Sequence, residues 1–208
     1  MAGQNKVKLA VIDYGMGNLR SVTKAFEHAG ADTRLVSNPS EVDKCDALIL
    51  PGVGALGDCI DGLNACKLAD TIKSWIKEDR PFLGICLGLQ ALFDYSEEGK
   101  VQGLGIIPGQ VRRFELSNEY KIPHMGWNNV NFVKETPINK DIPTNGEQFY
   151  FVHSYHIAPE NESSIWCKTN YEKSFASGIN IGNCYATQFH PEKSHRFGMN
   201  FLRAVIEN

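Results

Sequence analysis

Short apolar runs alternate with amphipathic segments along the first half of the chain. Residues 7–12, 48–52 and 80–85 are apolar runs of strand length. In segment 18–29 apolar residues recur at helical spacing on one face, and Gly30 follows where a helix would end. Strands that alternate with helices predict a mainly parallel sheet with helices on both of its faces.

The pattern changes after Gly103, where apolar runs are separated by turn residues. These runs predict further strands at 110–116, 128–133, 148–155 and 165–169. Segment 177–183 is typical of a hairpin, and a closing amphipathic helix is predicted after His195. The second half therefore adds antiparallel strands to an α/β fold. With no repeat, low-complexity stretch or linker, we expect a single domain over residues 1–208.

Composition narrows the class of protein. The 208 residues carry a formal net charge of -3, which gives no basic field for nucleic acid, and no stretch has the length of a membrane span. The first residues are too short and too polar for a signal peptide. The six cysteines form no C-x-x-C pair, which argues against a disulfide framework or a zinc site. We expect a cytoplasmic protein that binds neither nucleic acid nor membrane.

One cysteine stands between two glycines where an apolar run gives way to a predicted helix. Gly84 and Gly88 flank Cys86 at minus two and plus two, and the helical spacing then extends from Leu87 to Tyr95. A sharp strand-to-helix turn needs glycines at such positions, as in the G-x-S-x-G elbow. A thiol at a helix N-terminus is favoured as thiolate. A lone cysteine is more often a small core residue, but this context predicts a nucleophile.

A cysteine nucleophile needs a base, and His190 is the candidate. Glu192 lies two residues later, and Pro191 holds the chain extended, so the carboxylate can orient the imidazole. The apolar run that ends in Pro51-Gly52-Val53-Gly54 leads into a glycine-bracketed loop, whose N–H groups can face a developing oxyanion. The N–H groups of Val53 and Leu87 are the most favourable donors. These segments predict a Cys-His-Glu triad, Cys86, His190 and Glu192, with an oxyanion hole.

Together these residues resemble the class I, triad-type glutamine amidotransferases, which have a flavodoxin-like architecture. Within that family, the Pro-Gly-Val-Gly loop and the segment His124-Met125-Gly126-Trp127-Asn128 are similar to the glutaminase subunits of imidazole glycerol phosphate synthase. The resemblance covers nearly the whole chain and departs at no catalytic position. Segments 134–148 and 160–183 are less similar, so roles for these loops are not carried over.

The resemblance implies an enzyme that hydrolyses L-glutamine to L-glutamate and ammonia without a metal or organic cofactor. The ammonia would pass to a (β/α)8 cyclase subunit in histidine biosynthesis, with which the chain would form a heterodimer. It also implies roles for particular positions: oxyanion hole, Gly52, Val53 and Leu87; substrate binding, Gly54, Gln90, Ser154 and Tyr155; partner interface, Asn18, Met125, Trp127, Tyr150 and Lys193. His153 borders the substrate segment.

Three alternatives stay open at this level. A paralogous glutaminase could feed another amidotransferase synthase, for example one that amidates surface sugars. A related single-domain cysteine hydrolase would place its histidine soon after the cysteine, which His190 does not do. A non-catalytic regulatory subunit would lack a triad member, and none is missing here.

Overall fold

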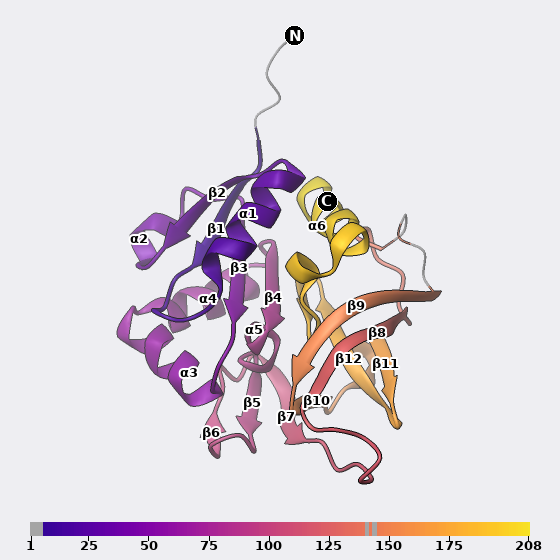
Figure 1. Ribbon diagram of the computed structural model, residues 1–208. Coiled ribbons are helices and arrows are strands. Elements are labelled where there is room, and N and C mark those ends of the chain that lie inside the picture. The colour runs from indigo at the N-terminus through magenta and orange to yellow at the C-terminus, as the bar shows by residue number, and fades with distance from the viewer. Residues whose placement is uncertain (1–5, 140–141, 143–144) are drawn as a thin grey trace.

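The computed structural model describes residues 6–139, 142 and 145–208 (Figure 1). Within them the strands are β1 Lys8–Ile12, β2 Asp32–Val36, β3 Ala47–Gly52, β4 Phe82–Cys86, β5 Phe93–Ser96, β6 Val101–Gln102, β7 Ile107–Arg113, β8 His124–Phe132, β9 Asn145–His153, β10 Tyr155–Pro159, β11 Ile165–Tyr171, β12 Lys173–Ile181 and β13 Cys184–Thr187. The helices are α1 Leu19–Ala29, α2 Pro39–Val42, α3 Leu56–Ala65, α4 Leu68–Lys77, α5 Leu87–Gln90 and α6 His195–Glu207, with 3-10 turns η1 Glu162–Ser164 and η2 Pro191–Lys193.

The described strands form one mixed sheet. Its main path runs in the order β2-β1-β3-β4-β13-β12-β10-β7-β5-β6. The first five strands of this path are parallel to one another, and β12 is antiparallel to β13. Strands β8, β9 and β11 branch from β12 as an antiparallel ribbon (Figure 1). The predicted α/β fold, with a parallel first half and antiparallel strands in the second, is confirmed.

Helices cover both faces of the parallel strands. Val11 on β1 packs in the same buried cluster as Phe26 of α1 and Phe201 of α6. The neighbouring Ile12 points to the opposite face and joins the cluster that contains Leu63 of α3 and Trp75 of α4. Alternation along a strand sends successive side chains to opposite faces, so one apolar strand supplies two cores.

Helix α1 shows how local sequence sets the boundaries. Val22, Ala25 and Phe26 are its buried residues, which is the predicted apolar face. Gly30 ends the helix with φ 117°, and its N–H donates to the Phe26 carbonyl at 3.1 Å. Only glycine reaches this left-handed conformation without strain, so the predicted stop is confirmed.

The helix predicted from Leu87 to Tyr95 is wrong beyond its first turn. Helix α5 ends at Gln90, and Phe93 to Ser96 form strand β5, which pairs in parallel with β7. The Leu92 carbonyl accepts N–H groups from Ile106 and Ile107 instead of one from its own segment. Pairing with a distant strand has therefore overridden a helical pattern. The thiol sits on a single turn of helix, so the helix dipole gives it less support than predicted.

The strand predicted at 148–155 is two strands. Strand β9 ends at His153 and β10 begins at Tyr155. Strand β9 pairs with β8 in the branch, whereas β10 pairs with β7 and β12 in the main sheet. Ser154 is where the chain passes from one set of neighbours to the other. The hairpin predicted at 177–183 is confirmed, because β12 ends at Ile181 and β13 begins at Cys184.

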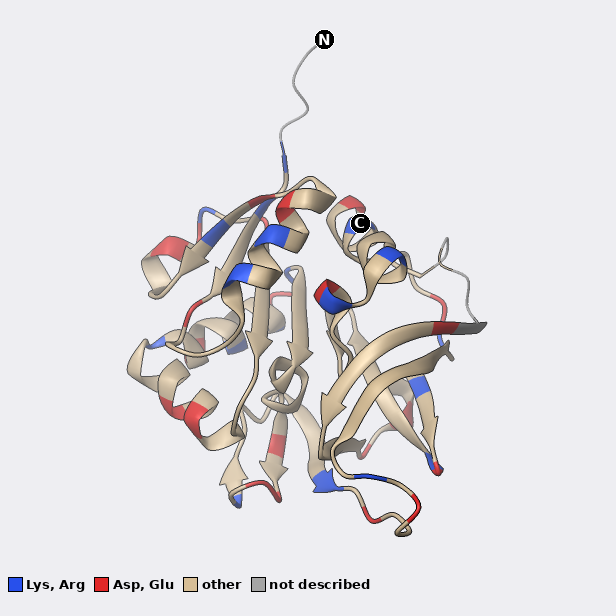
Figure 2. Cartoon of the chain, in the orientation of Figure 1, with Lys and Arg blue, Asp and Glu red and all other residues tan. Residues whose placement is uncertain are grey.

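Charged residues are distributed over the molecule without a continuous field of one sign. Figure 2 shows Lys and Arg interspersed with Asp and Glu on the helices and loops. None of the helices within the described residues is both long and apolar enough to span a bilayer. All six cysteines are free thiols.

Candidate active site

Cys86 ends strand β4 in a strained conformation. Its φ is 56° and its ψ is -104°, outside the regions that non-glycine residues usually adopt. A Cβ on Gly84 would lie 2.7 Å from the Gly88 carbonyl oxygen, and one on Gly88 would lie 1.9 Å from that of Leu50. The chain therefore turns so tightly after β4 that both flanking positions have room only for glycine. This tight turn has the geometry expected of a nucleophile elbow.

The predicted base and its orienting carboxylate form a buried pair. His190 Nδ1 lies 2.8 Å from Glu192 Oε1, and both side chains are 2% exposed. The prediction that Pro191 holds this segment extended is wrong, because Pro191–Lys193 form the 3-10 turn η2, and it is this turn that brings the two residues together. His190 N–H also donates to the Tyr150 carbonyl at 2.9 Å, which anchors the segment to β9. The Nε2 atom of His190 has no hydrogen-bond partner within the described part of the chain.

The charge state of His190 depends on Cys86. Burial alone would lower the pKa of His190, but the Cys86 thiolate and the Glu192 carboxylate outweigh burial and raise that pKa to about 9. The imidazole is therefore protonated at neutral pH when the thiolate is beside it. Such a thiolate–imidazolium pair combines a nucleophile with a proton donor for the leaving group.

A pocket of about 280 Å³ opens onto the thiol. Its lining brings together residues predicted separately for catalysis, oxyanion binding and substrate binding: Val53, Gly54, Cys86, Leu87, Gln90, Ser154, Tyr155 and His190. Gly52 lies at the end of β3, directly beside Cys86 in the parallel register. The predicted residues thus meet at the carboxyl ends of β3 and β4, where ligands bind in open α/β sheets.

Gly52 is tightly enclosed behind the pocket. A Cβ there would lie 2.7 Å from the Leu87 Cβ and 2.8 Å from the Tyr14 hydroxyl oxygen. Val53 is half-buried, and its φ is not positive in this structure. Because glycine has no Cβ, the loop at Gly52 can lie against Leu87 and Tyr14. This close packing lets the backbone N–H groups of the loop approach the thiol.

Two residues near the thiol were missed by sequence reasoning. Gln188 donates from Nε2 to the Cys86 sulfur at 3.6 Å and accepts from Gln90 Nε2 at 3.0 Å. Glu98 lines the pocket and accepts the Leu56 N–H at the start of α3 at 3.0 Å. Gln188 lies in the segment that also holds His190, which was the available signal. Glu98 lies in a polar loop, and nothing in the sequence around it indicated a role in the site.

Four of the five predicted interface residues gather beside the pocket. Met125 is 61% exposed and Trp127 is 43% exposed, both on β8. The Trp127 ring meets Tyr150 edge to face at 6.0 Å, and Lys193 Nζ lies 5.8 Å from the Tyr150 ring centre. We call Met125, Trp127, Tyr150 and Lys193 the β8 face. Asn18, the fifth residue, is exposed immediately before α1, and α1 packs against η2, the turn that holds Lys193.

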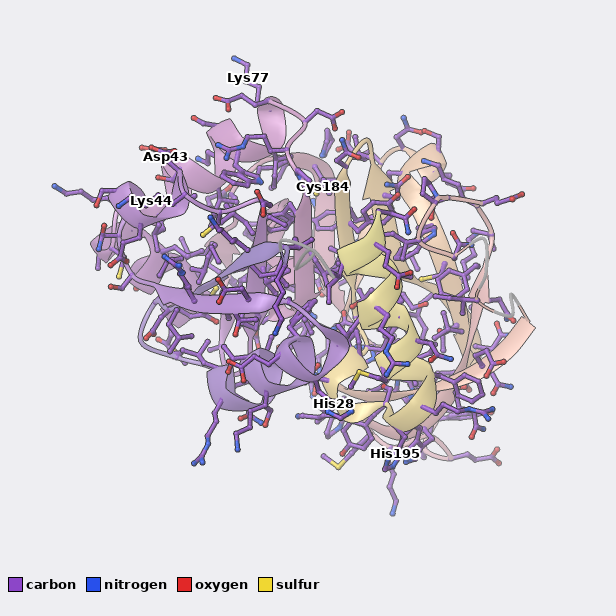
Figure 3. All side chains as sticks on the ribbon, turned by 90° about the horizontal axis from the view of Figure 1, so that it is seen from above. His28, Asp43, Lys44, Lys77, Cys184 and His195 are labelled. Atoms are coloured by element: carbon purple, nitrogen blue, oxygen red, sulfur yellow. The ribbon has the colours of Figure 1, made fainter. Side chains whose placement is uncertain are left out.

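A histidine of α6 stacks on the β8 face. His195 lies parallel to Trp127, with ring planes 8° apart and centres 4.9 Å apart. In the view from above, His195 lies at the edge of the molecule, whereas Cys184 lies near its centre (Figure 3). The stacking holds the Trp127 ring in one orientation while leaving it exposed.

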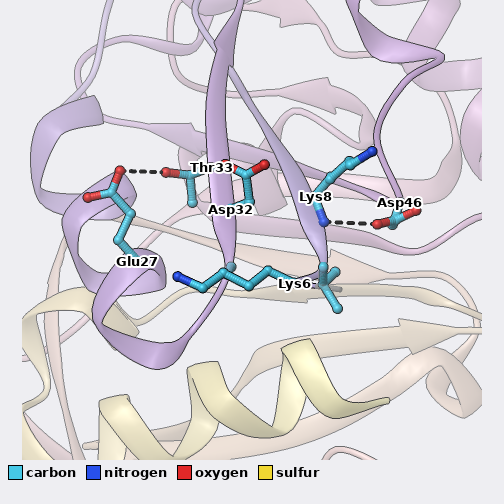
Figure 4. A pocket seen from close by; sticks show the side chains of 8 residues that line it. Lys6, Lys8, Glu27, Asp32, Thr33 and Asp46 are labelled. Atoms are coloured by element: carbon cyan, nitrogen blue, oxygen red, sulfur yellow. Dashed lines mark hydrogen bonds between the residues drawn. The ribbon is translucent and has the colours of Figure 1, made fainter. Parts of the chain in front are cut away.

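A larger hollow lies away from this chemistry. It has a volume of about 720 Å³ and lies at the amino ends of β1 and β2, among Lys6, Glu27, Asp32 and Asp46 (Figure 4). Its carboxylates already accept hydrogen bonds, from Thr33 Oγ1 to Glu27 and from Lys8 N–H to Asp46. It holds none of the predicted catalytic residues and is open to solvent. The smaller pocket, which holds the predicted residues, is therefore the candidate active site.

Residues 10–207 match the family Glutamine amidotransferase class-I. The match covers almost the whole chain, so this protein belongs to the class-I glutamine amidotransferases. Solved structures agree on the fold. PurLQS from Thermotoga maritima has a TM-score of 0.78 at 19% identity, over 98% of this chain and 99% of that chain. A glutamine amidotransferase from Thermotoga maritima has a TM-score of 0.69 at 16% identity, over 98% of each chain.

Curated relatives narrow the family further. Imidazole glycerol phosphate synthase subunit HisH of Nitrosococcus oceani is 49% identical, over 93% of this chain and 94% of its own length. The HisH subunit of Aquifex aeolicus is 48% identical, over 94% of this chain and 94% of its own length. The chloroplastic imidazole glycerol phosphate synthase hisHF of Arabidopsis thaliana is 46% identical over 95% of this chain, which spans 34% of that protein. The chain belongs to the HisH subunit family.

Proposed function

We propose that this chain is the glutaminase subunit of an imidazole glycerol phosphate synthase, with Cys86, His190 and Glu192 as its catalytic triad. The observation that carries the proposal is the buried 2.8 Å pair of His190 and Glu192, which shares a pocket with the strained Cys86. A thiolate, an imidazolium and a carboxylate in this order are what amide hydrolysis through a thioester needs.

The first half of the reaction forms the thioester. Cys86 Sγ attacks the side-chain amide carbon of L-glutamine, and the oxyanion is bound by the N–H groups of Val53 and Leu87. His190 gives its Nε2 proton to the amide nitrogen, because an unprotonated amide nitrogen leaves poorly. The carbon–nitrogen bond then breaks and ammonia departs. Glu192 holds the imidazole by its Nδ1 atom throughout.

The second half regenerates the thiolate. His190, now neutral, takes a proton from water, and the resulting hydroxide attacks the thioester carbon. The carbon–sulfur bond breaks and L-glutamate is released, with His190 again protonated. No metal or organic cofactor takes part, since the thiol and the imidazole supply both nucleophile and acid–base catalysis.

The rest of the pocket binds the amino-acid end of glutamine. Gly54, Gln90, Ser154 and Tyr155 offer amide and backbone groups for its carboxylate and ammonium. We add Glu98 to this set, because its carboxylate lines the same pocket and can pair with the substrate ammonium. A charged partner for the ammonium would distinguish free glutamine from glutamine within a peptide.

The ammonia passes to a cyclase subunit bound at the β8 face and Asn18. The HisH names of the relatives support a heterodimeric synthase, and so does the hisHF protein, of which this chain matches about a third. Exposed aromatic side chains beside the pocket suit a buried partner contact. We place this reaction in the cytoplasm, in histidine biosynthesis.

The direct test compares ammonia sources in the complex with the cyclase subunit. Cys86→Ala should lose synthesis driven by glutamine and keep synthesis driven by added ammonia. A glutamine-like diazo-ketone should label Cys86 and leave the other five cysteines unmodified. Labelling elsewhere, or full glutamine-driven synthesis by Cys86→Ala, would rule out the assignment.

A second experiment addresses the pathway. Expression of the chain with its cyclase partner should restore growth of a histidine auxotroph that lacks its own glutaminase subunit. A paralogue that serves surface-sugar amidation would hydrolyse glutamine in the presence of its own partner but would not restore growth.

A further inference from the structure

Two buried histidines outside the triad are joined by a hydrogen bond. His124 Nδ1 on β8 lies 2.9 Å from His153 Nε2 on β9, and both side chains are buried. His153 Nδ1 in turn lies 2.8 Å from the Tyr155 carbonyl oxygen. At the other end, Asn128 Nδ2 lies 3.1 Å from His124 Nε2. The mechanism above uses neither histidine.

The groups at the two ends of this hydrogen-bond series, the Tyr155 carbonyl and the Asn128 amide, determine which ring nitrogens carry protons. The Tyr155 carbonyl can only accept, so His153 carries its proton on Nδ1 and accepts at Nε2. Asn129 N–H donates to Asn128 Oδ1 at 2.8 Å, which makes Nδ2 the atom that faces His124. His124 therefore accepts at Nε2 and donates from Nδ1. Both rings are held in one tautomer, and every bond points toward Tyr155.

The surroundings keep both rings neutral and in place. Burial lowers the pKa of His124 to about 4 and that of His153 to about 3. His124 is stacked between Tyr171 and Phe151, at ring-centre distances of 4.1 and 4.8 Å. A protonated His153 would present an Nε2 donor to the Nδ1 donor of His124, which the arrangement does not allow.

The chain of bonds continues to the nucleophile. The Tyr155 carbonyl also accepts from Gln90 Nε2 at 3.1 Å, and Gln90 donates its second N–H to Gln188 Oε1. Gln188 then donates to the Cys86 sulfur. A continuous series of directed hydrogen bonds thus runs from β8 to the thiol.

The two sides of β8 have different environments. Met125 and Trp127 point outward on the β8 face, whereas His124 and Asn128 point inward to the chain of bonds. One strand therefore carries exposed aromatic surface on one side and the hydrogen-bonded histidine on the other.

We infer that His124 and His153 are positioning residues: they hold the Tyr155 carbonyl and Gln90 at the glutamine pocket and connect them to β8. The inference rests on the proposed function. It concerns substrate binding more than the chemical step, since the His190–Glu192 pair is anchored separately through Tyr150 and η2. Removing one hydrogen-bond donor from this series should therefore raise the KM for glutamine and affect kcat little.

The test uses the complex with the cyclase subunit and measures glutamate release. His124→Phe keeps the stacking but leaves His153 Nε2 without a donor, and should raise the KM for glutamine about tenfold with kcat within about threefold. His124→Asn places an amide near the former Nδ1 and should restore a KM near that of the wild type. The control is His156→Phe, since the His156 ring packs against Phe114 outside this series of hydrogen bonds, and the KM of this variant should not change.

A damaged fold has a different signature, because fewer active molecules lower the apparent kcat and leave KM unchanged. An unchanged KM in His124→Phe would overturn the inference. Nitrogen-15 NMR of the wild-type protein should show His124 and His153 protonated on Nδ1 alone, and an Nε2 proton on either ring would also overturn it. Failure of the wild-type complex to hydrolyse glutamine would instead reject the proposed function.

Discussion

His190 is a buried histidine whose pKa is raised by two neighbours, Cys86 and Glu192. Its isolated burial favours the neutral imidazole, whereas the Cys86 thiolate favours the imidazolium and is the largest opposing influence. A group with two such opposed influences is sensitive to the removal of either. The pKa of His190 therefore depends on Cys86 as well as on Glu192.

Cys86→Ala should lower the pKa of His190 below its wild-type value of about 9. With the thiolate removed, desolvation is opposed only by Glu192, so the proton should be lost at lower pH. Titration of the His190 ring by NMR from pH 5 to 10 gives both values. A variant that titrates at the same pH as the wild type would show that Glu192 alone sets the charge.

For single residues, the sequence predicted a role in the site where the partner of the residue lies close along the chain. The short spacing of His190 and Glu192 predicted their pairing, although the chain between them forms a 3-10 turn and not the extended segment expected from Pro191. Gln188, Glu98 and the His124–His153 pair were not predicted to act together. Their partners come from other strands, and no local pattern encodes those pairings.

Among the elements, the turn after β4 has very little steric freedom. Gly88 is packed against the Leu50 carbonyl of the adjacent strand, and Gly84 against Gly88. The turn can thus form only if β3 and β4 are paired in their native register. Strand pairing and the strained φ of Cys86 depend on the same close contacts.

Gly88→Ala should lower the free energy of unfolding by about 3 kcal/mol or more, because the new methyl would lie 1.9 Å from the Leu50 oxygen. Urea unfolding measures the change. Gly57→Ala in α3 is the matched control: its nearest neighbour would be Val101 Cγ1 at 3.5 Å. The control should be neutral or stabilising by up to about 1 kcal/mol. Equal stability of the two variants would contradict the steric account of the elbow.

The prediction of elements failed where two patterns coincided. The segment after Cys86 has helical spacing, yet Phe93 to Ser96 also suit a buried strand, and pairing with β7 decided the outcome. The run at 148–155 is continuous in sequence, but its two ends pair with different strands on either side of Ser154. Both errors concern which neighbours a segment meets, which its own residues do not specify.

Taken as a whole, the molecule places its exposed aromatic surface next to its pocket. The β8 face and the pocket share the strand pair β8–β9, and Tyr150 is bonded through its backbone to His190. Contacts with a partner at this face therefore act on elements that also hold the catalytic base.

Trp127→Ala should weaken binding of the cyclase subunit by about 2 kcal/mol or more, the usual size for a central interfacial aromatic. Lys193→Ala should weaken it less, and the difference should shrink at high salt because rim charges are screened. Calorimetric titration gives both affinities. Leu35→Ala is the control, since Leu35 is exposed on the far edge strand β2. Unchanged affinity for Trp127→Ala would exclude this face as the interface.

The loop at Val53 is where partner binding can control activity. Val53 has no positive φ here, and turning the Gly52–Val53 peptide so that its N–H faces the oxyanion can push this β-branched residue to positive φ. That conformation costs on the order of 1 to 3 kcal/mol, which would keep the unpartnered subunit nearly silent.

Val53→Gly should therefore raise glutamate release by the isolated subunit roughly tenfold. The exposed Val133→Gly, at the end of β8, controls for a general loss of rigidity and should leave this basal rate unchanged. A folded Val53→Gly protein with unchanged or lower basal turnover would show that valine strain does not restrain the enzyme.

The last strand of the sheet has a consequence for synthesis of the chain. Strand β13 lies between β4 and β12 and is the only described element that joins the parallel strands to the antiparallel ones. It is also the strand that leads into His190 and Glu192. A nascent or truncated chain that stops before Cys184 carries the thiol at an open sheet edge with no base beside it. We therefore expect glutamine hydrolysis only once β13 and the turn η2 have been synthesised and have folded against β4.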